Sequence, residues 1–223
     1  MEKILQKIDN YKHIVIVLDE NNSIGQLASA NALYTYLLQL HKKVSLFSKY
    51  DKFGLNLEFL PWKSKLRTSF PSSADGQIDA ISSIELFDYF IKNEIKLNVK
   101  MATSLYAGLL YETNGFQKIS LNHNIFLMAQ KLLESGADIK LCTKNILNYQ
   151  SLASLRLKAI LLNKMLLKEN ATLAVFNLND EDLKKSGANV EEADIVIEEA
   201  LSLTTVKKIV IIYKENIIRS VYE

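Results

Sequence analysis

The first fifty residues alternate between short apolar runs and a longer stretch with helical periodicity. The run from Ile14 to Leu18 is continuous, apolar and rich in β-branched residues, which is typical of a strand buried on both faces. Residues 27–38 place apolar side chains on one stripe of a helix, and residues 44–47 form a second apolar run. This order of strand, loop, helix and strand predicts a parallel pair joined by a right-handed crossover.

Helical periodicity dominates after residue 80. Helices are predicted over 80–92, 98–111, 123–135 and 139–147, with Asn122 as an N-cap and Gly136 just past a helix end. Residues 50–80 show no persistent periodicity and contain both prolines, Pro61 and Pro71. We therefore predict a loop there, with room for a short strand or turn.

A domain boundary is predicted at a long amphipathic helix over residues 149–168. Beyond it, strands are predicted over 171–176, 209–213 and 217–222, with helices after Asn179 and over 190–203. Residues 214–216 suit a tight hairpin in which Asn216 tolerates a positive φ. The expected organisation is an α/β domain over 1–148, a linking helix over 149–168 and a small α/β domain over 169–223.

Composition excludes few function classes. The chain has 223 residues with a net charge of +2, which provides no bulk attraction to nucleic acid or to an anionic membrane. Its only cysteine, Cys142, excludes an internal disulfide and a zinc site built from several cysteines. The N-terminal residues lack the pattern of a signal peptide, and the run at Ile14 is too short to cross a bilayer. A cytoplasmic protein without membrane insertion is the expectation.

Four segments carry a family resemblance. They read IVIVLDENNSIGQ (14–26), IDAISSIELFDYFI (78–91), ATSLYAGLLYETNGF (102–116) and AQKLLESGADI (129–139). Together they resemble the DHH-family phosphoesterases, in the branch of the RecJ-type exonucleases and the oligoribonuclease and phosphoadenosine-phosphate phosphatases. The resemblance implies a shortened DHH-type domain with a mainly parallel sheet and flanking helices. It also implies a truncated DHH-associated C-terminal domain, whose likeness stops before the family's Gly-Gly-Gly-His loop.

The resemblance also locates the positions where the family holds two metal ions, typically manganese, with aspartates and histidines. Alignment on Gly25 places Ile16 at the family histidine, Glu20 and Asn22 at the two loop aspartates, and Glu112 at the aspartate of the later motif. The Asp-His-His triplet is absent from the whole sequence, as though one or two strand–helix units were deleted. Isoleucine cannot bind a metal and asparagine is a weak ligand, so we predict a vestigial site with no tightly bound metal and no catalytic residue.

The motif residues that do not bind metal in the family are retained in this sequence. Gly25, Gly108, Thr113 and Gly115 are predicted to be structural, with Gly108 permitting a close helix approach. His13, His41 and His123 are isolated in sequence and are expected at the surface, and Cys142 is expected to pack.

A second candidate surface combines Trp62 with Lys63, Lys65 and Arg67. Such a mixture could contact single-stranded nucleic acid through stacking and phosphate pairing, although the nearby acids Glu58 and Asp75 weigh against it.

Three functions remain open from the sequence. The first is a non-catalytic DHH-family descendant that binds a protein partner or forms a homodimer. The second is a divergent phosphoesterase, dependent on Mn²⁺ or Mg²⁺, acting on small nucleotides or short oligonucleotides. The third is a nucleotide or single-strand binding module without hydrolysis.

Overall fold

The computed structural model describes residues 8–19, 23–51, 53–117 and 122–222. Contacts between its residues divide the chain into two compact units, 1–149 and 150–223, which we describe separately. No helix in the described ranges is long and apolar enough to cross a membrane.

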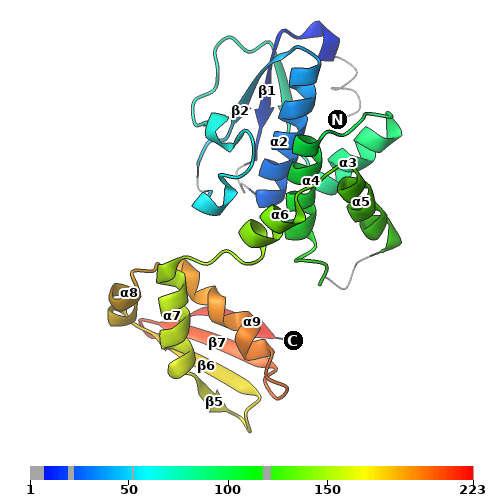
Figure 1. The fold of residues 1–223 in the computed structure, drawn as a ribbon. Helices are drawn as coiled ribbons and strands as arrows, with labels where there is room; N and C mark the ends of the chain where they lie inside the picture. The colour runs from blue at the N-terminus through cyan, green and yellow to red at the C-terminus, as the bar shows by residue number, and fades with distance from the viewer. Residues whose placement is uncertain (1–7, 20–22, 52, 118–121, 223) are drawn as a thin grey trace. The chain divides into compact units, whose positions relative to one another are not determined.

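The first unit is a parallel sheet with helices (Figure 1). Its strands are β1 (His13–Val17), β2 (Lys43–Phe47), β3 (Leu66–Arg67) and β4 (Gly76–Asp79), in the order β3-β2-β1-β4. Its helices are α2 (Ile24–Gln39), α3 (Ser83–Lys92), α4 (Val99–Glu112), α5 (His123–Glu134) and α6 (Ile139–Ile146), with 3₁₀ turns η1 (Ile8–Asn10), η2 (Leu55–Leu57) and η3 (Lys63–Lys65).

Strand β1 lies at the centre of this sheet and is almost entirely buried. It pairs in parallel with β2 on one side and with β4 on the other, and β2 pairs in parallel with β3. The prediction of a buried first strand in a parallel pair is therefore confirmed. The loop predicted over residues 50–80, with room for a short strand, contains β4, whose four residues become a strand through pairing with β1 about sixty residues earlier in the chain.

Helices α2 and α4 pack side by side in the core, and α3, α5 and α6 pack around α4 (Figure 1). Leu27, Leu33, Leu105 and Leu109 are among their fully buried side chains. Each helix begins at a polar cap, since Ser23, Ser82, Asn98, Asn122 and Asp138 all accept a bond from a first-turn N–H. Asn122 is the N-cap of α5, and Gly136 has a positive φ just past the end of that helix, as the sequence predicts.

The second unit is a mixed sheet with helices packed on it. Its elements are α7 (Leu152–Asn163), β5 (Leu166–Lys168), β6 (Leu173–Leu178), α8 (Asp180–Ser186), η4 (Val190–Val196), α9 (Ile197–Leu201), β7 (Lys208–Tyr213) and β8 (Asn216–Tyr222). The strand order is β5-β6-β7-β8, with β6 and β7 parallel and both outer pairs antiparallel. Ala174, Phe176, Ile209 and Ile211 join Leu157 of α7 in one core.

The helix predicted over 149–168 is shorter than expected and belongs to this second core. It begins after Ser151, whose hydroxyl accepts from the Ser154 N–H at 2.9 Å, and it ends at Asn163. Residues 166–168 form β5 instead, because they pair with β6. In the hairpin between β7 and β8, the positive φ angles fall on Lys214 and Glu215 rather than on the predicted Asn216. These two residues form a two-residue turn between the paired Tyr213 and Asn216, and such a turn matches the twist of the strands.

Candidate functional site

The carboxyl end of the parallel sheet is where open α/β folds bind ligands. Strands β1 and β4 both end there, at Val17 and Asp79. Helix α2 begins after Ser23 and helix α3 after Ser82, so two helix N-termini follow the strand ends. Gly25 and Glu112, two of the residues that the family resemblance singles out, lie at these helix starts.

Glu112 is the last residue of α4 and reaches across to both helix starts. Its Oε1 accepts a hydrogen bond from the Ser83 N–H at 2.7 Å. The same carboxylate lies so close to Gly25 that a Cβ atom there would be 2.5 Å from Oε1. The Ser83 hydroxyl completes the contact by donating to the Gly25 carbonyl at 3.1 Å. We call this arrangement the Gly25–Ser83–Glu112 junction, since it ties α2, α3 and α4 together.

One turn earlier on α4, Gly108 allows the same three helices to approach closely. A Cβ atom at Gly108 would overlap the Ser83 hydroxyl and would lie 2.6 Å from Ser83 Cβ and 3.2 Å from Ala28 Cβ. Any side chain here would push α4 away from α2 and α3. The sequence motif predicts the glycine, but not the identity of Ser83 as the group that it meets.

Thr113 and Gly115 shape the turn that ends α4. The buried Thr113 hydroxyl donates to the Leu109 carbonyl at 2.7 Å and accepts from the Phe116 N–H at 3.1 Å. Gly115 has a φ of +62°, in the region that favours glycine. Both residues thus fix the direction of the chain after Glu112.

The described residues do not fit a two-metal centre. Ile16, at the family histidine position, is fully buried in the apolar core. The neighbouring carboxylates Asp19 and Asp79 accept from Gln26 and Gln77, each at 2.8 Å. Within the ranges described, no three His, Cys, Asp or Glu side chains come together as a metal site would require.

Two of the predicted vestigial positions, Glu20 and Asn22, lie outside the described residues. The sequence pattern does not single out Asp79, because no periodicity marks the position of β4. The available signal was a carboxylate that follows an apolar residue and precedes a Ser-Ser pair.

The four residues of the candidate nucleic-acid surface have different environments. Lys63 is buried and its ammonium pairs with Asp51 at 3.1 Å and with Glu58 at 3.8 Å, whereas Lys65 and Arg67 are exposed. A lysine held in this way has no exposed charge for a phosphate. Trp62 stacks on Tyr34 with ring centroids 4.8 Å apart.

His13 is not the surface residue that the sequence predicts. Its side chain is buried, with Nδ1 2.9 Å from the Ser73 hydroxyl and Nε2 2.9 Å from the Ser45 hydroxyl. Buried imidazoles need partners for both ring nitrogens, and these two hydroxyls supply them. His13 therefore links β1, β2 and the segment before β4. His41 and His123 are exposed, as expected.

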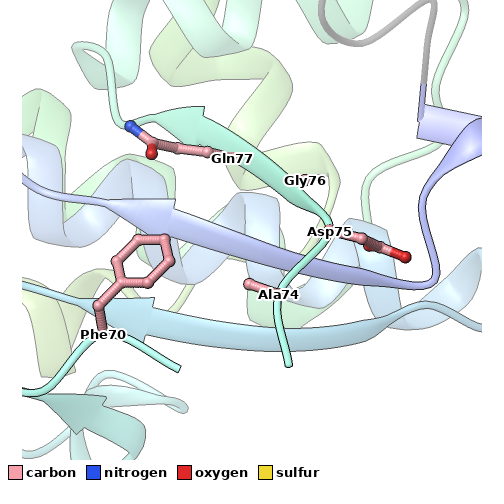
Figure 2. A pocket seen from close by; sticks show the side chains of 5 residues that line it. All are labelled: Phe70, Ala74, Asp75, Gly76 and Gln77. Carbon is pink, nitrogen blue, oxygen red and sulfur yellow. The ribbon is translucent and has the colours of Figure 1, made fainter. Parts of the chain in front are cut away.

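A small hollow of about 170 Å³ lies beside the start of β4, lined by Phe70, Ala74, Asp75, Gly76 and Gln77 (Figure 2). The Asp75 carboxylate accepts from the main-chain N–H groups of Lys12 and His13, at 2.8–3.1 Å. These bonds lower the pKa of Asp75 below its ordinary value. Its charge is thus used to hold this segment to β1.

One comparison with known proteins, that with solved structures, agrees with this architecture. No protein-family model matches the chain, and no curated protein matches it. An exopolyphosphatase-related protein from Bacteroides fragilis superposes with a TM-score of 0.78 over 96% of this chain and 79% of its own, at 17% identity. The chain shares the fold of that protein. A putative family II inorganic pyrophosphatase from Methanococcus jannaschii, at 15% identity, covers 95% of this chain and 70% of its own with a TM-score of 0.32, too low to carry an argument.

The α/β fold class predicted from the sequence is confirmed. A four-stranded parallel sheet flanked by helices is followed in sequence by a second, four-stranded mixed sheet. At 17% identity this likeness concerns the fold alone.

Proposed function

We propose that this chain is a non-catalytic relative of the DHH-type phosphoesterases, close to the RecJ-type branch, and that it acts by binding another protein. The observation that carries the proposal is the position of the Glu112 carboxylate at the start of α3, bonded to the Ser83 N–H. The aspartate at this place in the family motif is a metal ligand, whereas here the charge serves helix packing.

The energetics support a structural role for Glu112. A carboxylate at a helix N-terminus is stabilised by the helix dipole and by charge-assisted bonds to N–H groups. Turning the carboxylate toward a metal would leave the Ser83 N–H without this acceptor and would remove the tie between α3 and α4. Ile16 adds to the argument, because a buried isoleucine replaces the family histidine and binds no metal.

The test measures metal content and hydrolysis together with stability. We expect no stoichiometric manganese after purification, and no hydrolysis of a model phosphodiester, pyrophosphate or polyphosphate above background with Mn²⁺ or Mg²⁺. We also expect Glu112→Ala to lower the melting temperature, because it removes the acceptor of the Ser83 N–H at the start of α3. Stoichiometric manganese, with turnover that Glu112→Ala abolishes, would overturn the proposal.

A divergent metal-dependent phosphoesterase, acting on small nucleotides or short oligonucleotides, is the second candidate. The fold shared with an exopolyphosphatase-related protein favours it. In that case a short oligonucleotide or a nucleotide with two phosphates should be hydrolysed faster than polyphosphate in the same assay. The proposed non-catalytic function requires that neither be hydrolysed.

A further inference from the structure

The ends of α2 and α4 farthest from Glu112 form an apolar groove. Two adjoining hollows, of about 530 and 490 Å³, lie between the C-terminal half of α2 and the segment that leads into α4. Gln39 and Asn98 line both, so the hollows adjoin each other, and we call them together the α2–α4 groove. Leu38, Leu40 and Val99 line it while remaining 37%, 38% and 57% exposed.

One wall of the groove is held rigidly. The Trp62 main-chain N–H donates to Asn31 Oδ1 at 2.7 Å, and its indole Nε1 donates to the Thr35 hydroxyl at 2.8 Å. The ring stacks on Tyr34, and the Lys100 ammonium lies 5.1 Å from the ring centroid. A wall fixed before binding lowers the entropy cost of association.

The charge of the groove has one sign. Lys96 and Lys100 line it, and no aspartate or glutamate is among its described lining residues. The groove also contains the start of α4, where the first-turn N–H groups have no partner inside the helix, although Asn98 accepts from one of them. Both features favour an anionic occupant.

A protein segment fits this chemistry better than a nucleic-acid strand. Base binding to single strands depends on an open aromatic face. Here Tyr34 stacks on Trp62 and Lys100 lies over the same ring, so a base finds no free face. The exposed Leu38, Leu40 and Val99 instead suit aliphatic or aromatic anchor side chains.

We propose that the α2–α4 groove binds an acidic, amphipathic segment of a partner protein. Two apolar side chains of that segment occupy the two hollows, and flanking carboxylates pair with Lys96 and Lys100. The inference rests on the proposed protein-binding function and assigns it a surface at the end of α2 and α4 opposite the Gly25–Ser83–Glu112 junction.

The test is selection from a random dodecapeptide phage library against the intact chain, followed by measured affinities for the enriched peptides. We expect peptides with at least two large apolar residues and a net negative charge. Val99→Glu should weaken their binding by about tenfold or more, because it places a carboxylate in the apolar groove. Glutamate is favourable at the start of a helix, so this variant keeps its fold. Lys100→Glu should weaken binding similarly.

Leu55→Glu is the matched control, since Leu55 is 78% exposed in the same unit and lies outside the groove. It should leave the affinities unchanged. Failure to enrich acidic apolar peptides would refute the proposal that the groove binds such a segment. Equal affinity of these peptides for the Val99→Glu variant and for the parent chain would refute it as well. So would binding of a labelled oligothymidylate that Val99→Glu abolishes, or self-association that depends on Val99. None of these results depends on hydrolysis, so an active phosphoesterase with a peptide-binding groove remains distinguishable from an inactive one.

Discussion

At the scale of single residues, the contact between α2, α3 and α4 depends on two glycines that have no Cβ atom as well as on the side chains that bond. Gly25 leaves room for the Glu112 carboxylate, and Gly108 leaves room for Ser83. The space at these glycines lets one hydroxyl and one carboxylate bond across three helices. These contacts hold the ends of α2, α3 and α4 together.

Gly108→Ala should destabilise the chain by about 1–3 kcal/mol, because the added methyl overlaps Ser83 and forces the helices apart. Chemical denaturation measures this loss. Combining Gly108→Ala with Ser83→Gly, which removes the overlapping side chain, should cost less than the sum of the two single changes. An unchanged denaturation midpoint for Gly108→Ala would show that the close approach does not exist in solution.

At the scale of elements, β4 is held to β1 by side-chain hydrogen bonds in addition to the backbone bonds of the sheet. Asp75 precedes β4 and accepts from the Lys12 and His13 N–H groups at the start of β1, while the His13 ring bonds Ser73 and Ser45. A strand of four residues would otherwise be marginal at the edge of a sheet. These side-chain bonds therefore fix the register of the edge strand.

Asp75→Ala should lower stability at neutral pH, and the difference should vanish in acid. The bonds from Lys12 and His13 lower the folded-state pKa of Asp75 below the ordinary value of 3.8. Its stabilising contribution is therefore present above that ordinary value and is lost as the pH falls through the folded-state pKa. Denaturation of both proteins across this range measures the effect. Asp88→Ala, which removes an exposed carboxylate on α3, should show no comparable convergence with the parent chain.

At the scale of the whole molecule, β8 is an outer strand open to association. It is the outermost strand of the second sheet as described, seven residues long, with Ile217 and Tyr222 63% and 66% exposed. Arg219 is the charged residue within β8 that would protect this edge. The structure instead pairs Arg219 with Asp194 at 2.8 Å, so its charge is directed to η4.

We expect β8 to pair with a second copy of the chain, because an edge strand without a free charge or proline invites strand addition. Sedimentation should show a dimer that the double change Ile217→Lys and Tyr222→Lys converts to a monomer. Leu152→Lys adds a charge at a similarly exposed site on α7 and should leave the dimer intact. A parent chain that sediments as a monomer at all concentrations contradicts this expectation.

The sequence alone determined the local elements of this protein. The run at Ile14 to Leu18, the helical stripe of residues 27–38 and the caps at Asn122 and Asn179 could be predicted because strand burial, helix periodicity and capping depend on residues a few positions apart. The family motifs added the fold class for the same reason, since each motif is a pattern of residues a few positions apart.

The tertiary structure decided what depends on distant residues. Strand β4 exists because β1 pairs with it, His13 is buried because Ser45 and Ser73 meet its ring, and the Glu112 carboxylate is defined by Ser83, 29 residues earlier. The long helix predicted over 149–168 ends early because residues 166–168 pair with β6 as a strand. In the first three cases a partner far along the chain outweighs a local preference, and in the last case a neighbouring hairpin strand does. No periodicity within a single segment contains that information.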